Sequence, residues 1–111
     1  MSPQNFNTIA VNQIYVNESP LVFIVGSSPV FNINWLGTGT LTLPVNTLYR
    51  NKEDVSATYL TGSTTISGRV QTTKQAAFSV PGEYELYCQV TDGSIIRIKA
   101  IRLLIRKLGV F

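Results

Sequence analysis

The chain has 111 residues, of which 44% are hydrophobic and 14% are charged, and its formal net charge is +3. This length allows one domain with one core, and low charge with many Thr, Ser, Asn, Val and Ile is typical of a β-protein rather than a disordered chain. With no histidine and one cysteine, the chain excludes an intrachain disulfide, Ser-His-Asp or Cys-His catalysis and zinc sites.

Polar residues and a proline predict an extended arm over residues 1–8, and we expect no signal peptide because residues 1–12 lack a basic and an apolar region. A first short strand is predicted over residues 9–16. Residues 21–25 form a continuous apolar run, which predicts a strand that is covered on both faces. The chain has no apolar run of about 20 residues, so we expect no membrane span.

Residues 31–35 alternate between large apolar side chains and asparagines, which predicts a half-buried strand. We expect Trp35, the only tryptophan, to be the large residue at the centre of the core rather than a ligand-stacking platform. Leu41 and Leu43 are predicted to point inward in the next strand. Pro44 should end that strand, because proline cannot donate to a strand ladder.

The middle of the chain predicts several short elements. Residues 47–50 form a short strand, and residues 55–60 are ambiguous between a strand and one helical turn. Residues 64–66 and 70–73 form a small polar hairpin around a Ser-Gly turn, and residues 74–80 return as a strand. The residues of this last strand that should point inward are Ala76, Phe78 and Val80.

Residues 80–106 predict the organising element of the fold, two long antiparallel strands joined by a tight turn. Tyr84, Leu86 and Cys88 alternate with polar residues, the pattern of a strand with one buried face. We therefore expect these three side chains in the core. Cys88 should be a buried small hydrophobe, the alternative being a reactive thiol.

A three-residue loop over residues 91–93 gives this hairpin better cross-strand pairs than a two-residue loop would, because it matches apolar with apolar side chains. It also puts Gly93 at the left-handed position of such a loop. The alternation breaks at Ala100 and Ile101, which predicts a β-bulge there or a strand that changes sheets. The predicted pairs are Cys88–Ile96, Leu86–Ile98 and Tyr84–Ala100 on one face and Glu85–Lys99 and Tyr87–Arg97 on the other.

Turn signals recur every 8 to 12 residues and no stretch has helical periodicity, so the sequence predicts a sandwich or barrel of about seven to nine strands. This domain covers residues 9–107 and is followed by a short apolar tail over residues 108–111. The pair Glu53-Asp54 is far short of the six to eight oxygen ligands of calcium, so we expect no metal and no cofactor.

Basic residues gather near the C-terminus, which leaves nucleic-acid binding open as an alternative. Outward charges also blunt the edges of sheets, and two of these residues have predicted cross-strand partners, so we expect a solvated face and no nucleic-acid partner. The basic residues are Arg97, Lys99, Arg102, Arg106 and Lys107.

The run Pro81-Gly82-Glu83-Tyr84, followed by alternating apolar residues and Thr91-Asp92-Gly93, resembles the last two strands of immunoglobulin-like domains in bacterial surface and phage proteins. The resemblance implies an immunoglobulin-like antiparallel β-sandwich. It also implies that Tyr84 forms a tyrosine corner, with its hydroxyl bonded to backbone upstream, and that Trp35 is the core tryptophan. The inter-sheet disulfide of antibody domains is excluded, because Cys88 has no partner.

A longer stretch, residues 48–107, is similar to small immunoglobulin-like accessory proteins of tailed-phage virions. The similarity lies in Leu48-Tyr49-Arg50-Asn51-Lys52-Glu53-Asp54-Val55, Thr61-Gly62-Ser63, Ile66-Ser67-Gly68, Thr72-Thr73-Lys74 and Gly82-Glu83-Tyr84. It implies a structural role, in which the protein decorates or cements a capsid or sits at the neck or tail. No motif of that family defines functional residues that could be carried over.

We therefore expect a non-enzymatic virion structural protein, a capsid decoration or cement subunit that binds the major capsid protein or other virion proteins. It would be a homo-oligomer or be present in many copies on the particle. Candidate partner contacts are Phe6 in the arm and Leu108, Val110 and Phe111 in the tail.

Three alternatives remain from the sequence. The first is a phage neck or tail component. The second is an extracellular or cell-surface module for adhesion or carbohydrate binding, which would use exposed aromatic residues such as Tyr49, Tyr59 and Tyr87. The third is an enzyme, which would need two acids held together in a pocket, whereas the six acids are expected in turns and on the surface.

Overall fold

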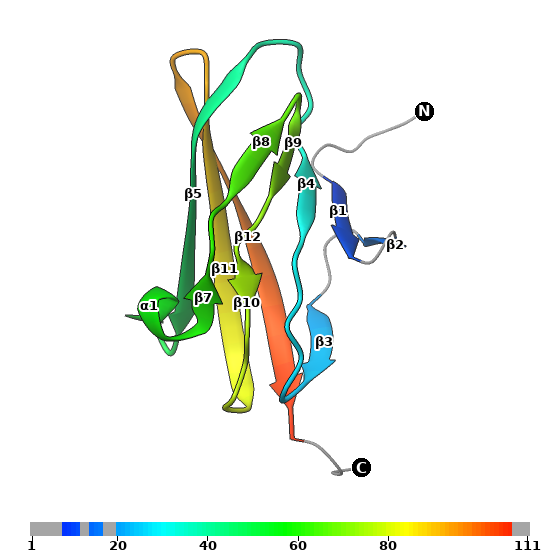
Figure 1. Cartoon of the computed structure of the whole chain (residues 1–111), viewed down its shortest axis with the longest axis vertical. Helices are drawn as coiled ribbons and strands as arrows, with labels where there is room; N and C mark the ends of the chain where they lie inside the picture. Colours follow the sequence, from blue (N-terminus) through cyan, green and yellow to red (C-terminus); the bar gives the residue numbers. More distant parts are fainter. Residues whose placement is uncertain (1–7, 12–13, 17–19, 108–111) are drawn as a thin grey trace.

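The computed structural model describes residues 8–11, 14–16 and 20–107. Two five-stranded sheets face each other, and a two-stranded sheet completes the fold (Figure 1). Nearly all strand pairs are antiparallel, and the described residues contain one helix of four residues. The prediction of an all-β immunoglobulin-like sandwich is confirmed, although the described strands number twelve and several have only two or three residues.

The first sheet has the strand order β2-β1-β4-β9-β8. The region that was predicted as one strand over residues 9–16 is instead the antiparallel pair of β1 and β2. The predicted polar hairpin is confirmed as β8 and β9. The bounds are β1 Thr8–Val11, β2 Ile14–Val16, β4 Asn32–Asn34, β8 Thr65–Ser67 and β9 Val70–Thr72.

The second sheet has the order β3-β12-β11-β5-β6, in which only β3 is parallel to its neighbour. Its bounds are β3 Leu21–Ile24, β5 Leu41–Arg50, β6 Glu53–Asp54, β11 Gly82–Asp92 and β12 Ile95–Arg106. The third sheet pairs β7 with β10, and α1 precedes it, so residues 55–60 take mainly the helical alternative. These elements are α1 Ser56–Tyr59, β7 Leu60–Thr61 and β10 Gln75–Ala76.

Two expectations about individual strands were wrong. The strand β3 is not covered on both faces, since Val22 and Ile24 are 53% and 47% exposed while Leu21 is buried. Pro44 does not end its strand either, because β5 absorbs it in a bulge: Leu43 and Pro44 together lie opposite one residue of β11. Leu43 has a φ of 51° there, and its side chain is 69% exposed instead of pointing inward.

The loop of the organising hairpin has two residues, not three. Asp92 pairs with Ile95, and the pairing of β11 with β12 then continues without a bulge to Gly82 and Ile105. Gly93 has a φ of 65° at the first position of the loop, which suits a type II′ turn. The predicted bulge near Ala100 and Ile101 is therefore wrong. The observed pairs are Cys88–Lys99, Leu86–Ile101, Tyr84–Leu103, Glu85–Arg102 and Tyr87–Ala100.

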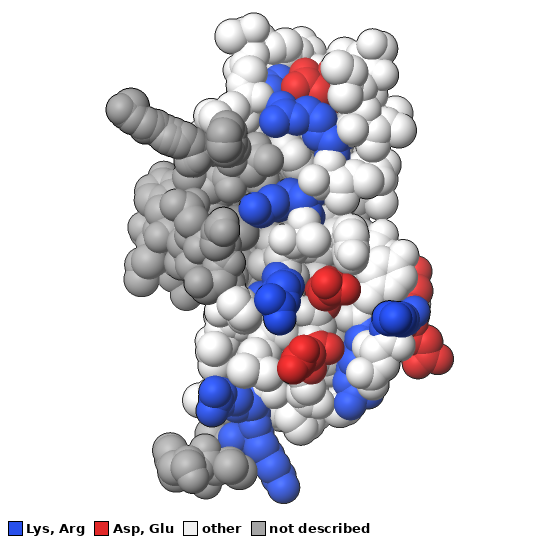
Figure 2. All heavy atoms as spheres, turned by 180° about the vertical axis from the view of Figure 1, so that it is seen from behind, with Lys and Arg blue, Asp and Glu red and all other residues white. Residues whose placement is uncertain are grey.

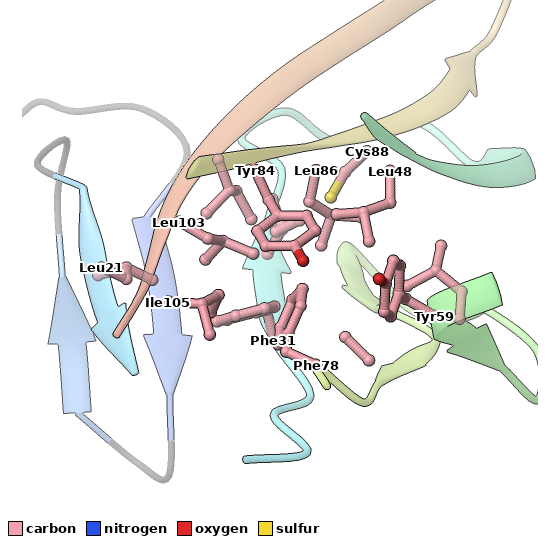
Figure 3. Packing of buried hydrophobic residues seen from close by; sticks show 14 of the residues in the cluster. Leu21, Phe31, Leu48, Tyr59, Phe78, Tyr84, Leu86, Cys88, Leu103 and Ile105 are labelled. Carbon is pink, nitrogen blue, oxygen red and sulfur yellow. The ribbon is translucent and has the colours of Figure 1, made fainter. Parts of the chain in front are cut away.

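The core lies between the two large sheets. Figure 3 shows Tyr84, Leu86 and Cys88 of β11 beside residues from other elements, such as Phe31 and Phe78. The ring centroids of Phe78 and Tyr84 are 4.8 Å apart. The five residues that the sequence places in the core are at most 1% exposed, namely Trp35, Phe78, Tyr84, Leu86 and Cys88.

Candidate interaction surface

The side chains of β5, β11 and β12 that point away from the core form the outer face of the second sheet. Since cross-strand partners share a face, the register defines its rows. Gln89 of β11 lies between Val45 of β5 and Ile98 of β12, and Tyr87 lies between Thr47 and Ala100 in the next row.

One half of this outer face is apolar and exposed. Val45, Ile96 and Ile98 are 43%, 61% and 56% exposed, and Tyr87 beside them is half-buried. We call these four residues the outer-face patch. Ile96 and Ile98 were predicted to point into the core, and the two-residue loop reverses that prediction. Contiguous exposed apolar residues rimmed by polar ones mark interaction sites.

A hollow of about 440 Å³ adjoins the patch. Tyr49 and Tyr87 line it together with Thr47 and Gln89. The two tyrosine rings meet edge to face, with centroids 5.4 Å apart and planes at 84°. Tyr59, the third candidate aromatic, is only 8% exposed. The described aromatics therefore do not form the flat row that would favour carbohydrate binding.

The other half of the outer face is charged, with both signs mixed. Arg102, Glu85, Tyr49 and Asp54 follow one another across β12, β11, β5 and β6. Figure 2 shows this mixture, and an area without charged side chains at its upper right, over the upper parts of β5, β11 and β12. A mixed surface of this kind has no strong positive field for nucleic acid.

The predicted cluster of basic residues does not form one surface. Arg97 and Lys99 lie on the other face of β12 from Arg102, and neither has its predicted partner, because they pair with Val90 and Cys88. The Arg97 guanidinium stacks on the Trp35 ring at 5.3 Å from its centroid. Arg97 thus caps the end of the core with its charge bonded to Asp92 at 3.1 Å.

Arg69, which the sequence interpretation missed, is the most connected polar side chain at this end of the sandwich. Its guanidinium donates to both carboxylate oxygens of Asp92, at 3.2 and 3.0 Å. It also donates to the backbone carbonyls of Trp35, Leu36 and Gly39. The bonds from Arg69, followed by those from Arg97, hold the pKa of Asp92 below its ordinary value. The only sequence signal was a lone basic residue directly after the turn glycine Gly68.

Tyr84 forms the tyrosine corner that the resemblance implies. Its hydroxyl donates to the Val80 carbonyl at 2.6 Å, and the residue is 1% exposed. The bond ties the start of β11 to the chain that enters it. This geometry stabilises the fold and offers no reactive group.

Replacing Tyr84 with phenylalanine should lower the free energy of unfolding by about 1 kcal/mol or somewhat more, because one buried hydrogen bond is lost and the ring stays. Urea denaturation measures the change. Tyr87→Phe, on the opposite face of the same strand, is the matched control and should be near neutral. Equal stability of Tyr84→Phe and the wild type would contradict the role of the corner bond.

Alkaline pH should destabilise the protein from about the ordinary pKa values of cysteine and tyrosine upward. Burial, followed by contact with Tyr59, raises the pKa of Tyr84 to about 12, and burial raises the pKa of the Cys88 thiol as well. The fold favours the neutral form of both side chains. Their contribution to the free energy of unfolding is therefore fully present below their ordinary pKa values, 10.0 for tyrosine and 9.0 for cysteine. It is lost as the pH rises above them. Melting temperatures from pH 7 to 12 should fall above about pH 9, and less steeply in Tyr84→Phe.

Among residues 8–11, 14–16 and 20–107, no three His, Cys, Asp or Glu side chains come together as a metal site would require. In the same ranges, no helix is both long and apolar enough to cross a membrane. The candidate partner contacts Phe6, Leu108, Val110 and Phe111 lie outside the described residues, so they stay predictions.

Comparison with known proteins gives structural neighbours only. No family model and no curated protein matches the chain. The crystal structure of CopC from Methylosinus trichosporium OB3b is similar with a TM-score of 0.58 and 11% identity, over 84% of this chain and 90% of that one. Two structures of complexes of titin M10 with obscurin-like 1 immunoglobulin domains have TM-scores of 0.51 and 0.52 at 13% identity, and cover 93% or more of each chain. None of these neighbours is described as a virion protein, and at this identity the likeness concerns the fold alone. The chain is an immunoglobulin-like β-sandwich.

Proposed function

We propose that this protein is a non-enzymatic structural subunit that works by binding other proteins, and that it decorates or cements the capsid of a tailed phage. The outer-face patch carries the first part of the proposal. Val45, Ile96 and Ile98 expose apolar surface next to a rim of mixed charge. This exposure does not stabilise a monomer. An apolar centre with a tyrosine and a polar rim is the usual anatomy of a protein interface.

Two further observations support the proposal. The titin M10 neighbours were determined as complexes with obscurin-like 1 immunoglobulin domains, so this type of sandwich serves there as a protein-binding module. The capsid assignment rests on the similarity of residues 48–107 to accessory proteins of phage virions. The major capsid protein or another virion protein would be the partner, and the virion would be the location.

Sedimentation with assembled phage heads tests the proposal. The protein should bind heads in a fixed, saturable ratio. Ile98→Glu should weaken binding because it puts a charge in the centre of the patch. Val22→Glu is the matched control, since Val22 is similarly exposed, at 53% against 56% for Ile98, at the far end of the same sheet. Protein that stays in the supernatant at all concentrations contradicts the capsid role.

Deleting residues 108–111 should leave the domain folded and weaken its assembly on the particle. The deleted segment contains three apolar residues, and each contributes roughly 1.5–3 kcal/mol when fully buried against a partner. Circular dichroism checks the fold, and the same sedimentation experiment measures binding. Unchanged binding would remove the tail from the proposed contacts.

A further inference from the structure

From the rows of the outer face, we infer that a second copy of this chain covers it, sheet face against sheet face, in a two-fold dimer whose axis runs along the strands. This inference deepens the proposed function and rests on it, because it names the occupant of the outer-face patch. Three observations carry it: the neutral patch, the distribution of charge across the strands and the area that a stable interface requires.

The patch requires an apolar and uncharged surface opposite it. Val45, Ile96 and Ile98 are aliphatic, and the residues between them in the rows are Gln89 and Thr91. A charged partner surface would be desolvated here without a counter-charge, which is unfavourable. A second copy of the same patch meets the requirement, as in any isologous interface.

The two ends of the charged row match those of a second copy for one orientation. Arg102 on β12 is positive, and Asp54 on β6 at the other side of the face is negative. A two-fold axis along the strands keeps each row at its height and exchanges the sides, so β12 of one copy lies over β5 of the second copy. Arg102 then faces Tyr49 and the adjoining Asp54 of the second copy. Glu85 at the centre of the row, on β11, then faces the Glu85 of the second copy, and each Glu85 has Arg102 of its own copy as its cross-strand partner. The same operation places Ile98 over Val45 of the second copy, at the rim of the hollow.

The area that a specific interface buries favours the same orientation. A specific interface buries about 800 Å² per partner, which is more than four side chains supply. The partner must therefore also cover the charged row. An axis across the strands would stack the patches but leave both charged rows without a facing surface. An axis along the strands covers the whole width of β12, β11 and β5.

Sedimentation equilibrium of the purified full chain tests whether the dimer forms. We expect a concentration-dependent dimer, since the interface is small to standard in size. Ile98→Glu should weaken it roughly 100-fold or more, because the change occurs twice in the interface. Val30→Glu, a change at an exposed position before β4 of the first sheet, should leave it unchanged, and circular dichroism should show both variants folded. A wild type that stays monomeric up to millimolar concentration overturns the inference, as does a folded Ile98→Glu variant that dimerises like the wild type.

Cross-linking tests the orientation. Ile98→Cys and Val45→Cys are made in separate chains, and the native Cys88 is buried and does not compete. With a short bismaleimide reagent, the mixture should give a covalent heterodimer, while each variant alone should give little. Efficient cross-linking of Ile98→Cys to itself would overturn the axis along the strands.

The outcomes separate this inference from the proposed function. A monomer that binds phage heads, and loses binding in Ile98→Glu, retains the proposed function and overturns the second copy as occupant. A dimer that does not bind heads supports the second copy and contradicts the capsid role.

Discussion

Replacing Trp35 with alanine should destabilise the protein by about 5 kcal/mol, which is the whole stability of many domains of this size. The side chain is 1% exposed, and its removal leaves a cavity that the two sheets cannot fill by a small shift. The indole Nε1 also donates to the side-chain amide oxygen Oε1 of Gln71 at 3.0 Å. Gln71 is fully buried, so the truncation leaves a polar group without its donor, which adds to the cost of the cavity.

Trp35→Phe separates the two contributions. It keeps most of the ring but removes the indole donor, so we expect a loss of about 2 kcal/mol. Because Trp35 is the only tryptophan, circular dichroism rather than fluorescence should follow urea unfolding. A Trp35→Ala variant that is destabilised by less than about 2 kcal/mol would show that the site collapses or fills with water, and that Trp35 is not central to the core.

The alternation of apolar and polar residues in β11 was enough to predict which of its faces is buried. Tyr84, Leu86 and Cys88 have the period of a strand with one buried face, and the structure buries all three. The corner bond of Tyr84 follows from the Gly-x-Tyr resemblance. These features are local, because they depend on residues within a few positions of one another. The sequence was therefore sufficient to predict them.

The predicted register of the hairpin was wrong because the pairing rule assumed that every charged side chain points outward. Arg97 lies on the core side of β12, where Asp92 neutralises it and the Trp35 ring packs against it. A charge is tolerated at the end of a sandwich when it is bonded in this way. The apolar pair Ile95-Ile96 allows either face, so the chain itself did not decide the register.

The interaction surface could not be predicted for the same reason. Once Arg97 faces the core, Ile96 and Ile98 must face outward, and the patch follows. Val45 joins them only because the bulge at Leu43 and Pro44 sets the register of β5. These residues are about 50 positions apart in the sequence, and only the assembled sheet brings them together.

Replacing Arg69 with alanine should lower the free energy of unfolding by about 3 kcal/mol. The side chain is 17% exposed and its guanidinium makes the bonds that join the loop after Trp35 to the tip of the β11–β12 hairpin. Its loss leaves the carbonyls of Trp35 and Gly39 without their side-chain donor. The Asp92 carboxylate then keeps only Arg97 as a donor. Arg69→Lys should recover little, because a lysine cannot reproduce the planar fork. Arg102→Ala, a change of an exposed arginine on the outer face, is the control and should cost less than about 0.5 kcal/mol.

A double-mutant cycle with Gly37 tests whether the arginine occupies this position in solution. An added Cβ at Gly37 would clash with a terminal nitrogen of Arg69, and the φ of 132° is itself unfavourable for alanine. Gly37→Ala should therefore destabilise the wild type more than it destabilises the Arg69→Ala variant, where the clash is gone and only the backbone strain remains. The difference between the two is the coupling between the positions. Additive effects would mean that Arg69 does not lie against Gly37, and that the tip of the hairpin is held by Arg97 alone.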